Sequence, residues 1–382
     1  MRPGWSPIRI ASRPRRPLRI RLVREAGGLG DIVCCLSALA WLEENFSRNG
    51  LTEKAVHRVD PLGRLGLSVG EPCELCVRGL GQYRALWEMS DVRFTWQSSE
   101  GGRESRRPRW ISPTEHYDED PDEYLLTLDL WCPFWPHEID RRAGYPKLSR
   151  LQIAARLAGA REEETAPPRL VPDLASADWA RQWLRLNNHH SEPLVLIYPL
   201  CHGPARIWPV DRWAGVAETL WRERGCRVVV CAARAREIAW WARHAPYFAR
   251  VSNLRDPGAH LGWQRMTALI AAADLVLCSD TGPYHIAGAV KTPAVGVFGM
   301  TSGEITSRHY PLARWVQGGR GRLVRSDADV RCAAPCYHRW HDGFGGDLCK
   351  SEGCASLMRI RPADVLREAF VVLAERKVAH AV

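Results

Sequence analysis

The second half of the chain alternates short apolar runs with amphipathic runs, and this alternation restricts the fold more than any other feature. The apolar runs at 193–199 and 226–233 have the length of strands, and the segment between them, 211–225, has helical spacing and ends at a glycine. The same order continues with predicted helices at 236–245 and 263–273 and predicted strands at 274–279 and 292–299. Because strands separated by helices pair in parallel, the sequence predicts a doubly wound α/β sheet.

The first half opens with the same kind of unit. LRIRLV at 18–23 predicts a strand, GGLGD at 27–31 a glycine turn, and IVCCLSALAWLEENF at 32–46 a helix. Further along, the pattern predicts loops at 97–124, a strand at 125–131 and a helix at 149–160. The chain of 382 residues therefore suits two α/β domains.

The stretch REEETAPPRLVPD at 161–173 is acidic and then proline-rich, so we interpret it as the linker between the domains. We predict a basic, disordered tail at 1–17, an N-terminal domain at 18–172, a C-terminal domain at 173–361 and a final helix within 362–382.

Charge gives a weaker indication of function. The chain carries 53 Lys and Arg against 43 Asp and Glu, a net charge of +10. Such a surface suits an anionic partner, such as nucleic acid, anionic lipid or a phosphorylated sugar, or it serves solubility alone. The arginine-rich first 24 residues could contact anionic head groups or form a solvated leader. The arginines are dispersed and no nucleic-acid module is recognisable, so we expect no nucleic-acid partner.

No apolar run approaches the roughly 18 residues of a membrane-spanning helix, and no apolar segment of a secretory signal follows the N-terminal arginines. We therefore expect a cytoplasmic protein.

The glycine turn at 27–31 is the first candidate site. Gly28 and Gly30 would let backbone N–H groups approach a ligand just before the helix begins. Asp31 could cap that helix, for which Asp is well suited. Alternatively, Asp31 could face the ligand edge of the sheet and act as a general base.

A second candidate site follows the predicted strand at 193–199. In HGPARIWPVDRW, Arg206 would lie near the edge of the sheet, where a guanidinium can neutralise a diphosphate. It could equally be an ordinary surface arginine. We expect Trp208 and Pro209 to pack and to start the next helix.

The third candidate site is SDTGPYHIAGAV at 279–290, where a strand passes into a helix. Thr281 and Gly282 would form the turn, and Pro283 suits the first helical turn. The N–H groups at the helix start and the helix dipole favour an anion, although Asp280 and Thr281 could instead cap a turn that binds nothing. His285 could contact a ligand or be a satisfied, half-buried histidine.

Four of the 13 cysteines form two close pairs within 332–354. The pairs are Cys332 with Cys336, and Cys349 with Cys354, and 12 residues separate them. This arrangement suits a structural four-thiolate metal site, with free thiols and then disulfides as alternatives. His338 or His341 could replace one cysteine. The pair in CELC (73–76) has no second pair nearby and is interpreted as structural.

Together these motifs resemble glycosyltransferase family 9, the heptosyltransferase-like enzymes that build the inner core of lipopolysaccharide. The resemblance lies in GGLGD, GPARIWP, ADLVLCSDTGPYHIAGAVKTPAVGVFG and TSGEITSRHYP, which occur in the order of the family. It covers about residues 18–375 and is strongest from 193 to 311.

The resemblance implies a GT-B fold, in which two Rossmann-like domains face each other across a cleft. The N-terminal domain would receive the acceptor, the C-terminal domain would hold a nucleotide sugar, and the final helix would pack back on the N-terminal domain. It also implies an inverting reaction without a catalytic metal, and some relatives that modify proteins bind iron near the cysteines. Zinc or iron at the cluster would therefore be structural.

The resemblance also implies roles for individual residues. Asp31 matches the expected base, and Arg206 stands where the family usually has a lysine. Asp280, Thr281 and Gly282 match the donor-binding Asp-Thr-Gly, and Pro283 and His285 belong to the same segment. Glu237 is the counterpart, by loose spacing, of a glutamate near the ribose.

The leading function is therefore transfer of a heptose from a nucleotide donor, ADP-heptose, to a lipopolysaccharide core acceptor. The alternative is the same chemistry with another donor sugar or a protein acceptor, and a lower alternative is a non-catalytic nucleotide-sugar binding protein. The basic surface suits a phosphorylated glycolipid acceptor and peripheral contact with the cytoplasmic face of the inner membrane.

Overall fold

The computed structural model divides the chain into two compact units, Met1–Arg169 and Leu170–Val382. This division lies close to the boundary predicted after residue 172. The structure describes residues 8–10, 16–24, 28–99, 124–130, 148–186, 192–201, 206–231, 262–319, 321–324, 329–332 and 354–379.

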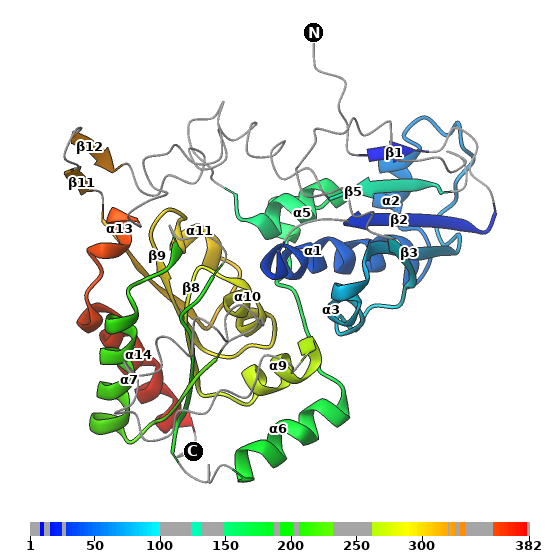
Figure 1. The fold of residues 1–382 in the computed structure, drawn as a ribbon. Helices are drawn as coiled ribbons and strands as arrows, with labels where there is room; N and C mark the ends of the chain where they lie inside the picture. The colour runs from blue at the N-terminus through cyan, green and yellow to red at the C-terminus, as the bar shows by residue number, and fades with distance from the viewer. Residues whose placement is uncertain are drawn as a thin grey trace. The chain divides into compact units, whose positions relative to one another are not determined.

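The first unit is built on a mostly parallel sheet of five described strands, in the order β1-β5-β2-β3-β4 (Figure 1). The strands are β1 (Ile8–Ile10), β2 (Leu18–Arg24), β3 (Cys73–Leu80), β4 (Thr95–Ser99) and β5 (Leu126–Asp129). β2 pairs in parallel with β3 and β5, and β1 joins the edge antiparallel to β5. The strands predicted at 18–23 and 125–131 are thus confirmed. The tail predicted as disordered at 1–17 is wrong at 8–10, because these residues form β1 and pair with β5.

The predicted loop at 97–124 is wrong at its start, because Gln97–Ser99 belong to β4. This strand pairs with β3, which contains the cysteine pair of CELC. β3 was not predicted, although its residues Leu75 and Val77 are buried in the core. Its polar and charged residues interrupt the apolar run, so the sequence alone gives a weak strand signal.

The described helices of the first unit are α1 (Leu29–Leu42), which continues as the π-helical turn η1 (Glu43–Ser47), and α2 (Glu53–Val59), α3 (Arg84–Glu88) and α5 (Arg150–Ala158). α1 and α5 confirm the helices predicted at 32–46 and 149–160. α5 begins with a capping box, in which the Ser149 hydroxyl accepts from the Gln152 N–H and the Gln152 side chain accepts from the Ser149 N–H. Its packing against α1 places the starts of both helices in one region of the unit.

The second unit contains a parallel sheet of five described strands, in the order β10-β9-β8-β6-β7. They are β6 (Leu194–Tyr198), β7 (Arg227–Val230), β8 (Leu275–Ser279), β9 (Ala294–Phe298) and β10 (Ala313–Gln317). All residues of β6, β8 and β9 are buried. This explains why the central strands could be predicted as continuous apolar runs. A separate antiparallel pair consists of β11 (Gly321–Val324) and β12 (Asp329–Cys332).

Helices cover both faces of this second sheet (Figure 1). The described helices of this unit are α6 (Leu174–Leu186), α7 (Val210–Arg224), α9 (Gly262–Ala271), α10 (Gly282–Ala289), α11 (Gly303–Ser307), α13 (Ala355–Met358) and α14 (Pro362–Ala379). α7 and α14, far apart in the sequence, lie side by side on one face. On the other face α10 packs on β8 and β9, and α9 packs on α10. The predicted helix at 236–245 lies outside the described residues.

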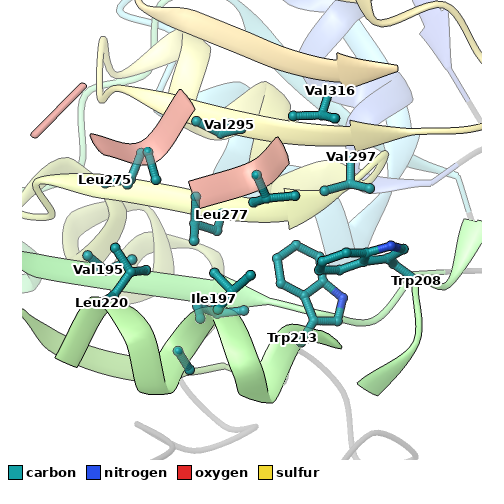
Figure 2. Close-up of a cluster of buried hydrophobic side chains, with 14 of the residues drawn as sticks. Val195, Ile197, Trp208, Trp213, Leu220, Leu275, Leu277, Val295, Val297 and Val316 are labelled. Atoms are coloured by element: carbon teal, nitrogen blue, oxygen red, sulfur yellow. The ribbon is translucent and has the colours of Figure 1, made fainter. Parts of the chain in front are cut away.

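A buried cluster joins β6, β8 and β9 to α7 and α14. Figure 2 shows its strand residues beside the two indole rings of Trp208 and Trp213. The ring centroids are 4.8 Å apart in an edge-to-face arrangement. The Trp208 Nε1 also donates to the carbonyl of Ile360, at 3.2 Å, just before α14. Trp208 therefore packs, and Pro209 is the N-cap of α7, so both lie where the next helix starts, as predicted.

The final helix α14 contributes Val365, Ala369, Val372 and Leu373 to this cluster of the second unit. A contact of this helix with the N-terminal domain stays a prediction. Among the residues that the structure describes, no helix combines the length and apolar character needed to cross a membrane.

Candidate functional site

The topology of the second sheet marks one place for a ligand. β6 lies between β7 and β8, so the chain leaves β6 toward one side and leaves β8 toward the other. The connections therefore diverge beyond the carboxyl ends of β6 and β8. In open α/β sheets, ligands bind at such a switch point.

Arg206 and Asp280 meet at this switch point. Asp280 directly follows β8 and is only 8% exposed. The Arg206 Nη1 lies 3.7 Å from the Asp280 Oδ2 and donates to the Asp280 backbone oxygen at 3.2 Å. The contact with Asp280 fixes the partly exposed Arg206 guanidinium at the edge of the sheet, as predicted from the sequence.

Thr301 is a member of this cluster that the sequence analysis missed. It lies in the connection after β9, and its hydroxyl donates to the Asp280 Oδ2 at 2.8 Å. Asp280 therefore orients Arg206 while Thr301 orients Asp280. The sequence did carry a signal for Thr301, because a polar segment follows the buried strand β9, just as a polar segment with Asp280 follows β8.

The helix after this turn begins at Gly282, next to the predicted Pro283. Thr281 is the N-cap with extended backbone, and its hydroxyl makes no capping hydrogen bond. The alternative of a turn capped by the Thr281 side chain is therefore not what the structure shows. The Thr281 hydroxyl and the Gly282 N–H remain suited to an anionic ligand, whereas Pro283 has no N–H and the Tyr284 N–H donates to the Thr281 carbonyl.

His285 has a protein partner. Its ring is buried, and its Nδ1 lies 2.9 Å from the Tyr310 hydroxyl. The two rings also pack edge to face. These contacts favour the structural interpretation of His285, and its role in donor binding stays a prediction.

Two buried side chains next to the turn at 280–282, those of Cys278 and Tyr284, are neutral. Burial raises the pKa of the Cys278 thiol well above its ordinary value, and the Asp280 carboxylate raises it further. Burial also raises the pKa of the Tyr284 hydroxyl, although a hydrogen bond with Ser307 opposes this shift. Both groups therefore stay protonated at neutral pH, and neither adds negative charge to the site.

A second cluster lies at the corresponding place in the first unit. β2 lies between β3 and β5, so the chain continues from β2 to β3 on one side, while β5 pairs with β2 on the other. Arg24, the last residue of β2, is buried, and its Nη1 donates to the carbonyl of Leu130 just after β5. Its Nη2 lies 3.9 Å from the Asp31 Oδ2.

The predicted glycine turn at 27–31 is wrong in its second half, because α1 already begins at Leu29. Gly28 is the N-cap, and Gly30 and Asp31 are the second and third residues of the helix. The Asp31 Oδ2 accepts from the Gly28 N–H at 2.8 Å, so Asp31 does stabilise the helix start, although not from the N-cap position. Its Oδ1 forms an ion pair with the Arg150 Nη1. The carboxylate side chain is 21% exposed. A capping contact and a partly exposed carboxylate thus coexist, and the role of base stays a proposal.

Arg24 and Arg150 were not predicted as site residues. Arg24 stands in a predicted strand, and Arg150 lies at the start of a predicted helix far along the chain. Only the packing of α1 on α5 brings Arg150 to Asp31.

Several predicted site residues have no described geometry. Glu237, Cys336 and Cys349 lie outside the described residues. Cys332 ends β12, and Cys354 is buried just before α13. In the described ranges, no group of three or more His, Cys, Asp or Glu residues could hold a metal ion.

Comparison with known proteins supplies independent evidence. A family model described as "Glycosyltransferase family 9 (heptosyltransferase)" matches residues 134–326, half of the chain. The matched range contains Arg206, Asp280 and Thr301.

Two curated relatives match parts of the chain. Lipopolysaccharide heptosyltransferase 3 of Escherichia coli K12 is 32% identical over 114 residues, which are 28% of this chain and 31% of the relative. Lipopolysaccharide heptosyltransferase 2 of Salmonella typhimurium LT2 is 26% identical over 178 residues, 46% of this chain and 45% of the relative. The matches thus span less than half the length of each relative.

A solved structure matches nearly the whole chain. It is the E. coli ADP-heptose lipopolysaccharide heptosyltransferase II, with a TM-score of 0.60 and 17% identity. The match covers 94% of this chain and 100% of that one. The fold of this chain is accordingly the predicted GT-B fold, with two α/β domains.

Proposed function

Because this chain belongs to glycosyltransferase family 9, we propose that it is an inverting glycosyltransferase that moves a heptose from ADP-heptose to a lipopolysaccharide core acceptor. The observation that carries the proposal is the Arg206–Asp280 pair at the switch point of the second sheet. It lies beside the start of α10, where a diphosphate can be held. The phosphorylated glycolipid acceptor suits the net charge of +10. We propose that the enzyme meets this acceptor at the cytoplasmic face of the inner membrane.

On the donor side, negative charge develops on the leaving nucleoside diphosphate as the bond to the sugar breaks. Arg206 would stabilise this charge, because a guanidinium offers several donors to phosphate oxygens. Asp280 holds Arg206 through its carboxylate and its backbone oxygen. Thr281 and Gly282 would supply a hydroxyl and backbone N–H groups.

On the acceptor side, a hydroxyl must lose its proton as its oxygen bonds to the anomeric carbon. Asp31 would accept that proton. Its carboxylate lies beside Arg24, at the carboxyl end of β2, and is partly exposed. The proposed reaction uses no catalytic metal.

The experiment that tests this function is a nucleotide and acceptor screen. We expect ADP to raise the thermal unfolding temperature of the protein more than UDP or GDP does, and ADP-heptose to be consumed only with a lipopolysaccharide core acceptor. Stabilisation by UDP or GDP alone would instead select another donor sugar. Binding of ADP-heptose without transfer to lipopolysaccharide or protein acceptors would identify a non-catalytic binding protein.

The four-cysteine segment 332–354 carries a separate prediction, a structural zinc or iron ion. We expect protein purified without added metal to contain about one equivalent of metal, as a closed four-thiolate site would hold. Cys336→Ser should lower the metal content. Cys201 lies after β6 and outside the segment, so Cys201→Ser should leave the metal content unchanged. Wild-type protein that contains no metal would contradict the prediction.

A further inference from the structure

We propose that Arg150 covers the proton-accepting oxygen of Asp31 in the free chain, and that an anionic group of the acceptor draws Arg150 away. The inference rests on the proposed function, in which Asp31 is the base. It makes Arg150 a residue that determines acceptor specificity. The anionic group would be a phosphate or a carboxylate, since both accept two parallel hydrogen bonds from a guanidinium.

The two oxygens of Asp31 have different surroundings. Oδ2 accepts from the Gly28 N–H and faces Arg24, whose side chain is 5% exposed. Arg24 is itself bound to the Leu130 carbonyl, so it is fixed between the ends of β2 and β5. Oδ2 is therefore held within the fold.

Oδ1 faces Arg150, whose side chain is 36% exposed. The backbone of Arg150 is fixed, because it begins α5, which packs on α1 and starts with the capping box of Ser149 and Gln152. Its long side chain can change partner without movement of the helix. Oδ1 is thus the oxygen that can be uncovered.

Proton transfer to Oδ1 favours this uncovering. A general base must come within about 2.6–3.2 Å of the atom that carries the proton. A guanidinium accepts no hydrogen bond and does not deprotonate, so Arg150 cannot relay the proton. When an acceptor anion replaces Asp31 as the partner of Arg150, Oδ1 can take the hydroxyl proton. The acceptor oxygen then bonds to the anomeric carbon, and the nucleoside diphosphate leaves with the electron pair.

The test compares Arg150→Gln with Arg156→Gln, a matched control that removes an exposed charge from the same helix. Each variant is assayed with core oligosaccharide that is intact, dephosphorylated or carboxyl-reduced. We expect Arg150→Gln to raise KM for the intact acceptor about tenfold, as for loss of one charge-assisted hydrogen bond. With the treated acceptor that lacks the recognised group, the kcat/KM of Arg150→Gln should equal or exceed that of wild type, because Oδ1 of Asp31 is already open in this variant.

If Arg150→Gln lost kcat/KM equally with all three acceptors, the inference would be overturned, since Arg150 would then only hold Asp31 in position. Identical behaviour of the two variants would overturn it as well. If Arg150→Gln does not fold, Arg150→Lys keeps the charge without the guanidinium fork and should show the smaller KM increase. Arg150→Lys kinetics identical to wild type would then overturn the inference.

A binding measurement separates this inference from the proposed function. If wild type transfers sugar to no acceptor, the proposed function fails. Calorimetry with inorganic phosphate on ADP-saturated protein then still tests the exchange of partners. Arg150→Gln should bind phosphate about tenfold more weakly than Arg156→Gln. Equal binding by these two variants of equal net charge would overturn the exchange.

Discussion

Asp31→Asn should lower the turnover of sugar transfer by about 10²–10⁴-fold, the usual contribution of a general base. The amide has nearly the shape of the carboxylate, and its oxygen can still accept from the Gly28 N–H, so the start of α1 should persist. The amide cannot take the acceptor proton at neutral pH. The measurement is kcat with saturating donor and acceptor.

Two controls accompany this variant. ADP binding should match wild type, because Arg206 and Asp280 belong to the second unit. Asp91→Asn makes the same chemical change at an exposed residue of the first unit, paired with Arg169, and should leave turnover unchanged. Near-wild-type transfer by Asp31→Asn would refute the assignment of the base.

Arg206→Ala should weaken the binding of ADP by about 10- to 100-fold, since a hydrogen bond to a charged group contributes about 1.5–3 kcal/mol. The variant removes the guanidinium but leaves Asp280 its hydrogen bond from Thr301. Titration calorimetry with ADP measures the change. Arg206→Lys restores the charge without the planar fork and should recover part of the affinity.

The matched control is Arg222→Ala on α7, where the side chain is 60% exposed and paired with Glu218. It removes the same net charge near the end of α7, just before β7 begins, and should leave ADP affinity within about twofold of wild type, because salt screens an exposed charge that does not contact the ligand. Unchanged ADP binding by Arg206→Ala would show that the donor phosphates lie elsewhere.

The second sheet was largely predictable because its central strands are buried on both faces. β6, β8 and β9 therefore read as uninterrupted apolar runs, and Gly225, in the left-handed conformation, ends α7 as predicted. β10 was missed because it lies at the edge of the sheet order, and its residue Trp315 is exposed. A partly exposed strand carries too little apolar signal to stand out.

The donor side of the candidate site was also visible in the sequence. Asp280 and Arg206 each follow a predicted strand, and the carboxyl ends of parallel strands meet at one edge of the sheet. Thr301 was missed because its contact depends on how the connection after β9 returns to β8.

The sequence by itself determined the α/β class, the central strands and the turn residues. These depend on local patterns of burial, spacing and backbone preference. Only the tertiary structure decided the partners of Asp31. Gly28 is a neighbour in the chain, but Arg24 reaches Asp31 from the end of β2, and Arg150 reaches it because α5 packs on α1. An ion pair between distant segments leaves no local pattern, since neither partner shows in its own neighbourhood which charge it will meet.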